Sequence, residues 1–251
     1  MDISQLAKPV EWLNANQGIV SVAIFLLTLF LGWVSGIFSS LRRKSKLKIT
    51  LIPGPTFCSI LPTGQKYGGF EVHRTVFALY MNVANVGSAP TSIDSVSVGY
   101  HWNIRPLSWN WLRYRVGWFW LHNQAVALED FQVQIGDRIK FYPFLTQRSS
   151  ISGHKTDTYL ETGRSVNGVV YYEQSDSWGG CQPMPYGNET KIVVSITDVF
   201  GKRFRQRFRI SIVPLEEARE YNPSFGDTIS ALRRGPTTTK DRTASNSDER
   251  A

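Results

Sequence analysis

Residues that build chemical sites are scarce in this chain of 251 residues. It has only two cysteines, Cys58 and Cys181, whose separation matches no zinc or redox spacing. None of its four histidines has a cysteine or carboxylate partner at a ligand spacing. A Gly-rich phosphate loop, a serine elbow and an HExxH motif are all missing. We therefore expect no enzyme activity, with no catalytic residue, no metal site and no cofactor.

Charge is missing from a long stretch near the N-terminus. No charged residue occurs from Trp12 to Leu41, and fifteen of the twenty residues 19–38 are apolar. A helix of about twenty residues spans the roughly 30 Å hydrocarbon core of a bilayer. The sequence therefore predicts a transmembrane anchor over residues 19–41. The competing interpretations are a buried core helix and a cleaved signal peptide.

Acidic residues are missing from the run RRKSKLK, residues 42–48. The formal net charge of the chain is +8, and the 22 basic and 18 acidic residues from position 49 onward leave a net of only +4 there. Basic residues beside a membrane segment stay on the cytoplasmic side. We expect an uncleaved anchor in the inner (plasma) membrane, residues 1–18 outside the cytoplasm, and the main domain in the cytosol. The membrane-proximal basic residues are Arg42, Arg43, Lys44, Lys46 and Lys48.

Small residues recur every four positions in the anchor, at Thr28, Gly32 and Gly36. This spacing lets two membrane helices approach closely, so a homodimer through this face is one expectation. The alternative is that glycine is simply common in membrane helices.

Helical periodicity is nearly absent between residues 46 and 213, where apolar residues alternate instead. Period-two alternation is typical of half-buried strands, and many short strands favour an all-β antiparallel sandwich over residues 49–214. The segment 166–173 is apolar on both faces and is expected to be central. The other expected strands are 46–52, 75–85, 93–100, 131–135, 136–142, 189–201 and 203–213.

The segment LYMNVANVGSAPTSIDSVSV, residues 79–98, resembles the immunoglobulin-like sandwiches found in many bacterial surface and membrane proteins. The closing hairpin of residues 191–213 resembles the last strand pair of such domains. The resemblance implies a fold alone, because this architecture hosts unrelated functions. The Cys-Trp-Cys signature of antibody domains is missing, which leaves the strand order open.

Aromatic residues concentrate in residues 101–122, which hold five of the eight tryptophans and three arginines. One interpretation is an insertion whose tryptophans cap the core. The other is contact with a membrane surface or a partner, since tryptophan with arginine is typical of both. The candidate interface aromatics are Trp109, Trp111, Trp118 and Trp120.

The stretch RFRQRFR, residues 203–209, mixes basic and aromatic residues. In a strand, Phe204 and Phe208 share the inward face and the arginines share the outward face. The arginine row is either a solvated face, with which neighbouring carboxylates could pair, or a contact for an anionic surface. The residues concerned are Arg203, Arg205, Arg207 and Arg209.

The chain turns helical after Val213, at residues 215–221 and 227–234, with Asp227 as the expected N-cap. Residues 235–251 contain no large apolar residue and are expected to be disordered.

Together these features favour a non-enzymatic, single-pass membrane protein whose cytosolic sandwich is an interaction or scaffolding module. The expected partners are membrane lipid and an unidentified protein. One alternative is a module that binds an anionic surface, of which nucleic acid is the less expected kind. The other is a sensor or effector that oligomerises through its helix.

Overall fold

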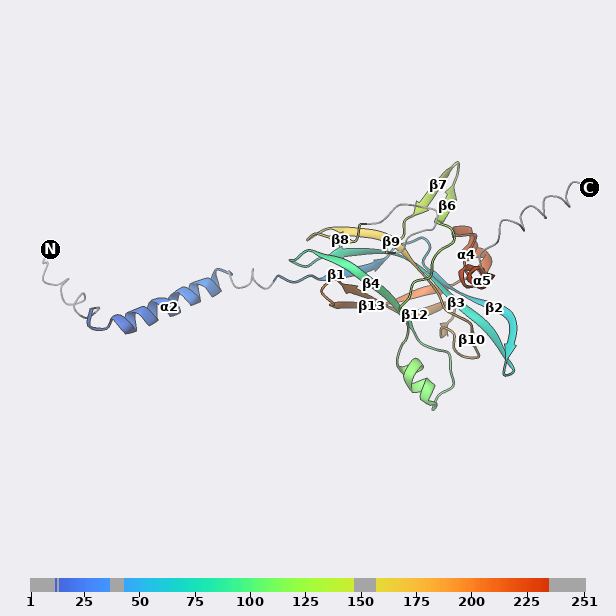
Figure 1. The fold of residues 1–251 in the computed structure, drawn as a ribbon, viewed down its shortest axis with the longest axis horizontal. Coiled ribbons are helices and arrows are strands. Elements are labelled where there is room, and N and C mark those ends of the chain that lie inside the picture. Colours follow the sequence, from blue (N-terminus) through green and yellow to red (C-terminus); the bar gives the residue numbers. More distant parts are fainter. Residues whose placement is uncertain (1–11, 13, 37–42, 147–156, 235–251) are drawn as a thin grey trace, which may run out of the picture. The chain divides into compact units, whose positions relative to one another are not determined.

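The computed structural model describes residues 12, 14–36, 43–146 and 157–234. The chain divides into two compact units, Met1–Lys44 and Ser45–Ala251. It is mostly β, with 45% strand and 21% helix (Figure 1).

The first unit contains the helix α2, Gln17–Val34, none of whose side chains is buried. It is long and apolar enough to cross a membrane. Thr28 and Gly32 lie within it, whereas Gly36 follows it with a φ of 76°, the left-handed conformation that glycine favours after a helix. Gly36 is therefore part of the turn that ends the helix, and only two of the three predicted small residues share a helix face.

The second unit is built from strands, one short π-helical segment and two short helices. Its elements are β1 (Leu47–Leu51), β2 (Phe57–Tyr67), β3 (Phe70–Asn85), β4 (Thr91–Tyr100), η1 (Trp111–Val116), β5 (Phe119–Leu121), β6 (Phe131–Ile135), β7 (Arg138–Tyr142), β8 (Tyr159–Leu160), β9 (Ser165–Glu173), β10 (Ser177–Trp178), β11 (Pro185–Tyr186), β12 (Glu189–Asp198), β13 (Arg203–Ile212), α4 (Leu215–Tyr221) and α5 (Thr228–Arg234).

The main sheet has the strand order β1-β3-β2-β13-β12-β4-β5, while β9 pairs with β3 and β6 pairs with β7 separately. Most pairs are antiparallel, but β13 and β2 run parallel where Ser211 and Ile212 pair with Phe57 and Cys58. The sheet is therefore mixed. The sequence predicted an antiparallel sheet throughout, and the β2–β13 pair shows that this prediction is wrong. An immunoglobulin-like arrangement is not confirmed.

Two cores lie on opposite faces of β3 and β9. Phe77 and Leu79 of β3 join side chains of β4 and β12 in the larger core, whereas Val76 and Ala78 join the smaller one. Residues of β9 divide in the same way, and its segment Gly168–Tyr172 is fully buried. This confirms that residues 166–173 form a strand with two buried apolar faces, whereas the predicted central position is wrong, because β9 pairs with β3 alone among the described strands.

The strand β2 was not predicted from the sequence. Pro62 and Gly64 interrupt its pattern, and both residues weaken a strand assignment. The chain accommodates them with a shift of register against β3 between Pro62 and Lys66. A bulge of this kind inserts extra residues and locally disrupts the ladder, which hides the strand from a pattern of alternation.

The two predicted C-terminal helices are confirmed as α4 and α5. Asp227 holds the N-cap position of α5 by its carbonyl, to which Ala231 N donates, but its carboxylate binds Arg219 at 2.9 Å. The free N–H groups of Thr228 and Ile229 instead donate to the carboxylate of Glu173 in β9, each at 3.1 Å. The prediction that the Asp227 carboxylate caps α5 is therefore wrong. The carboxylate of Glu173, in the distant strand β9, accepts these hydrogen bonds instead. The predicted disordered tail, 235–251, lies outside the described residues.

The turn between β12 and β13 forms hydrogen bonds with the start of the domain. Asp198 Oδ1 accepts hydrogen bonds from the N–H groups of Phe200 and Lys202, and its Oδ2 accepts one from the Ser45 hydroxyl at 2.7 Å. Lys202 Nζ in turn donates to the carbonyl of Ser45. The closing hairpin therefore holds the first residue of the domain in place.

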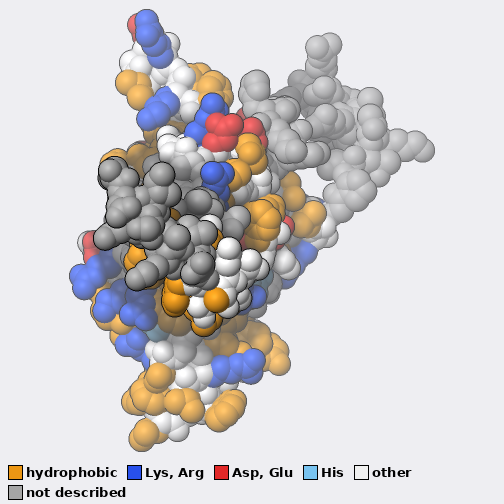
Figure 2. All heavy atoms as spheres, turned by 90° about the vertical axis from the view of Figure 1, so that its left-hand side faces the viewer, with side chains coloured by type: hydrophobic (Ala, Val, Ile, Leu, Met, Phe, Trp, Pro, Cys, Tyr) orange, Lys and Arg blue, Asp and Glu red, His pale blue; other side chains and the backbone are white. Residues whose placement is uncertain are grey.

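Two segments project from opposite sides of the domain, the β6–β7 hairpin and the η1 segment (Figure 1). Ile139 and Phe141 of the hairpin are exposed, as are Leu107 and Trp109 before η1. At the top and the bottom of Figure 2, where these two segments lie, apolar side chains occur together with Lys or Arg. The strands predicted at residues 131–135 and 136–142 are confirmed as β6 and β7. Their apolar residues Ile135, Ile139 and Phe141 are exposed and do not contribute to the core.

Candidate functional site

The strand β13 presents four arginines on one side and apolar residues on the other. All four arginines are exposed, whereas Phe204 and Phe208 pack against the larger core. This confirms the alternation predicted from RFRQRFR, because successive strand residues point to opposite faces. Both phenylalanines are therefore partly buried and face the larger core.

Neighbouring strands extend the outward side of β13. Arg209 pairs with Lys191 of β12, and Arg207 pairs with Val193. Val193 in turn pairs with Gly99 of β4, and Gly99 pairs with Trp120 of β5. Four strands thus share one surface, which we call the cationic face; its basic residues are Arg203, Arg205, Arg207, Arg209 and Lys191.

Two of the predicted aromatics join the cationic face. Arg205 Cζ lies 5.1 Å from the ring centroid of Trp120, and Arg207 Cζ lies 5.8 Å from that of Trp118. Both distances permit a cation–π attraction. The sequence predicted the arginines and the tryptophans as separate candidates, and the structure brings these two pairs together.

The other tryptophans of the segment 101–122 take different places. Trp109 is 74% exposed, and Trp111, the first residue of η1, is half-buried. Trp102 packs against the larger core together with Phe119. Some residues of this segment therefore cap the core, as one interpretation predicted, while others are exposed, and contact with a membrane surface or a partner stays a prediction.

The basic residues of the cationic face lack acidic partners within the described part of the chain. The ion pairs there join Arg74, Arg164, Arg219 and Arg233 to carboxylates, and none involves the face. Alternate residues of a strand lie about 6.6 Å apart, and like charges on paired strands repel one another. The prediction that neighbouring carboxylates neutralise the arginine row is therefore not supported.

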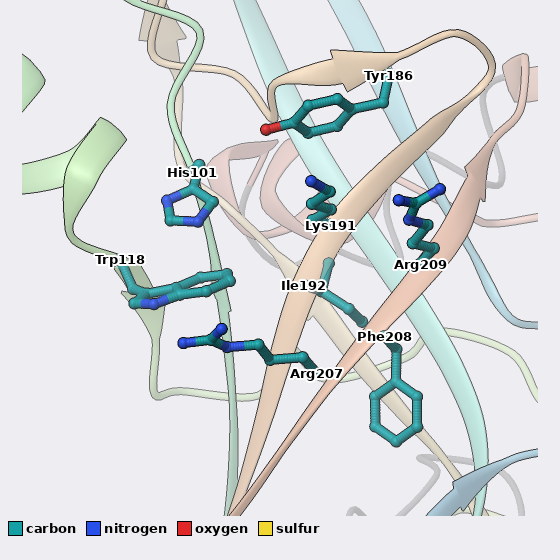
Figure 3. A pocket seen from close by; sticks show the side chains of 8 residues that line it. All are labelled: His101, Trp118, Tyr186, Lys191, Ile192, Arg207, Phe208 and Arg209. Carbon is teal, nitrogen blue, oxygen red and sulfur yellow. The ribbon is translucent and has the colours of Figure 1, made fainter.

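A groove of about 440 Å³ opens at one end of the cationic face (Figure 3). Its lining residues come from β11, β12, β13 and the segment between β4 and β5, and none is acidic. They are His101, Trp118, Tyr186, Lys191, Ile192, Arg207, Phe208 and Arg209. The groove is thus a concave, positively charged site.

His101 forms part of the groove wall and is hydrogen-bonded there. Its Nδ1 donates to the carbonyl oxygen of Gly117 at 2.7 Å, which leaves Nε2 as the acceptor of the neutral ring. Burial lowers the pKa of His101, the bond to Gly117 acts in the opposite direction, and the charges of Arg115, Arg207 and Lys191 lower it further.

The lowered pKa of His101 predicts that the domain loses stability in acid. Below about pH 6.5 the unfolded chain binds a proton at this histidine more readily than the folded chain does, so the free energy of unfolding falls as the pH falls. In His101→Asn, the amide keeps a donor for Gly117 and removes the titration. Urea unfolding between pH 7.5 and 5.5 should show a smaller loss of stability in this variant, and an unchanged loss would contradict the assignment.

Gly99 allows the ring of Trp120 to pack closely against β4. A Cβ at this position would come within 2.8 Å of Val193 Cγ1 and 3.2 Å of the Trp120 ring. We expect Gly99→Val to displace the indole from Arg205 and to destabilise the domain by about 1–3 kcal/mol. Near-ultraviolet circular dichroism and urea unfolding measure both effects. Ser95→Val, on the same strand face but exposed, is the control, and equal effects of the two variants would contradict the prediction.

The predicted membrane-proximal run divides between two settings. Arg42 lies outside the described residues, and Arg43 and Lys44 are exposed. Lys46 is exposed beside β1, and Lys48 is exposed within that strand. The basic run therefore continues into the first strand of the domain.

Among the described residues, no three His, Cys, Asp or Glu side chains lie together in a way that could hold a metal ion. Cys58 is buried in the larger core, and Cys181 is half-buried. Burial raises the pKa of both thiols, which disfavours the reactive thiolate.

Comparison with known proteins adds little to this geometry. No family model and no curated protein sequence matches the chain. One similar solved structure is described as an ApaA protein from Bordetella pertussis, with 10% identity over 68% of this chain and 96% of that chain, at a TM-score of 0.24. Another is a structural-genomics target with 9% identity over 67% of this chain and 85% of that chain, at a TM-score of 0.22. Both scores are too low to carry an argument about fold or function.

Sequence reasoning missed three residues of the groove: His101, Tyr186 and Lys191. Each belongs to a segment far along the chain from at least one of its groove neighbours. The pairing of β12 with β13, β4 and β11 brings them together. The outward alternation of Lys191 in β12 was the one local signal available.

Proposed function

We propose that this protein is a non-enzymatic, single-pass membrane protein whose domain binds an anionic surface through the cationic face. The observation that carries the proposal is the set of five basic residues on that face without an acidic partner in the described residues. An uncompensated row of like charges costs stability, and an anionic partner offsets that cost.

The anchor and the orientation are parts of the same proposal. The apolar helix α2 and the basic residues that follow it support a cytosolic domain beneath an inner (plasma) membrane, with the N-terminus outside. The cytoplasmic leaflet carries anionic lipid, and each basic residue near its surface contributes about 1 kcal/mol of binding. Lipid is therefore the anionic surface that we expect.

We also propose a sandwich arrangement of the immunoglobulin-like kind for the domain. The support is the larger core, in which side chains of β3 and β9 pack against those of β4 and β12. The helix-mediated oligomer remains a second candidate, supported by Thr28 and Gly32 within α2.

The test uses the full chain in nanodiscs of phosphatidylcholine, mixed with vesicles of phosphatidylcholine alone or with phosphatidylglycerol. We expect co-sedimentation only with the anionic vesicles, weakening steeply as salt is raised, because exposed charges are screened. Equal binding to both kinds of vesicle, or no binding to either, would contradict the proposed function. Preference for single-stranded nucleic acid over the vesicles would favour a nucleic-acid module instead.

A further inference from the structure

The groove concentrates cations more densely than the rest of the cationic face. Lys191, Arg207 and Arg209 line it together, whereas Arg203 lies on the same face but outside the groove. Figure 3 shows the charged ends of these three side chains around one opening. Three positive charges exceed what a single carboxylate balances, while a phosphate monoester carries a charge of about −1.5 to −2 at pH 7.

The donors in the groove suit a phosphate group. Two guanidinium groups offer paired N–H donors, a geometry that matches phosphate oxygens. The hydroxyl of Tyr186 accepts a hydrogen bond from Arg115 at 3.2 Å, so its own hydrogen is available to a ligand. Lys191 Nζ lies 4.3 Å from the Tyr186 ring centroid, which places the ammonium over the face of that ring.

The indole of Trp118 in the groove is not an open platform for a nucleobase. The ring of His101 lies 3.8 Å from that of Trp118, centroid to centroid, and Arg207 lies near the indole as well. In Figure 3 the indole lies between these two side chains. Binding of single-stranded nucleic acid relies on bases stacked upon exposed aromatic faces. A covered indole therefore favours a ligand recognised by its charge.

The size of the groove indicates that the phosphate is part of a larger molecule. A volume of about 440 Å³ falls in the range of small-molecule sites, roughly 300–1,000 Å³. We propose that the groove binds a phosphate monoester carried on a small polar group, as on a phosphorylated lipid headgroup or a soluble phosphate ester. This proposal rests on the proposed function, because it names the ligand of the same face.

The test titrates the full chain, in phosphatidylcholine nanodiscs, with glycerol 3-phosphate and with inorganic phosphate by calorimetry. Arg207→Gln is compared with Arg203→Gln, which removes the same charge from the same strand face outside the groove. We expect saturable binding that Arg207→Gln weakens by about tenfold or more, the effect of losing one charge-assisted hydrogen bond. Arg203→Gln should change it by less than about twofold.

Vesicles distinguish the two sources of the phosphate. Preference for phosphatidic acid, a monoester, over phosphatidylglycerol at equal surface charge would assign the groove to a lipid headgroup. Binding of glycerol 3-phosphate without that preference would assign it to a soluble ester. If neither soluble phosphate shows saturable binding, and the two variants affect binding to anionic vesicles equally, the proposed phosphate site in the groove is wrong. The proposed binding to an anionic surface would then still stand. No binding to anionic vesicles at all would overturn both proposals.

Discussion

Replacing all four outward arginines of β13 with glutamine is expected to weaken binding of the full chain to anionic vesicles by about three orders of magnitude. Each basic residue near an anionic surface contributes about 1 kcal/mol, and four such contributions amount to about three factors of ten in the binding constant. The substitution leaves Phe204 and Phe208 in the core, so the fold should survive. Co-sedimentation at low salt measures the loss.

A matched variant separates the cationic face from net charge alone. It removes four other exposed basic residues and leaves the same net charge: Lys66, Arg138, Lys140 and Arg234. We expect this control to lose little affinity, because its charges lie away from the face. An equal loss in both variants would show that net charge, and not the arrangement on β13, determines binding.

Glu173→Ala is expected to lower the free energy of unfolding by about 3–5 kcal/mol, the typical effect of removing one partner from a buried ion pair. The carboxylate of Glu173 has no exposed surface, lies 3.7 Å from Arg74 Nη1, and accepts the first N–H groups of α5. Its removal leaves the N–H groups of Thr228 and Ile229 without this acceptor. Urea unfolding of the full chain in detergent measures the effect.

The control for this prediction is another ion pair on the same domain. Glu161 and Arg164 form a 3.0 Å pair with side chains 54% and 73% exposed. Exposed pairs contribute roughly 0–1 kcal/mol, so Glu161→Ala should change the stability by no more than that. Similar unfolding midpoints for Glu161→Ala and Glu173→Ala would contradict the assigned role of the buried carboxylate.

Local alternation made part of this fold predictable. The outward arginines of β13 follow from period two alone, because each residue's side is set by its neighbours in the chain. The buried residues of β9 follow from a continuous apolar run, which is typical of a strand buried on both faces. The apolar helix was equally clear, since an uncharged run of this length is typical of a membrane anchor.

Pairing between distant segments was not predictable in the same way. The parallel contact of β2 with β13 depends on a strand that Pro62 and Gly64 disguise. The contact of Arg205 with Trp120 depends on the register of four strands. Glu173 replaces Asp227 as the acceptor at α5 because tertiary packing brings β9 to that helix. Each of these depends on which strand lies beside which, a property that no single segment encodes.

The central claim is that the cationic face lies against an anionic membrane surface. A fluorophore on Ser95→Cys, in a Cys181→Ser background, reports on that face, because Ser95 is exposed on β4 in the row of Arg203. A second label on Asp137→Cys reports on the turn of the β6–β7 hairpin. With the full chain in bilayers containing a headgroup-attached quencher, we predict strong quenching at Ser95 in anionic lipid, reversed by salt, and little at Asp137. Quenching at Ser95 that is equal in neutral and anionic lipid, or stronger quenching at Asp137, would contradict the account.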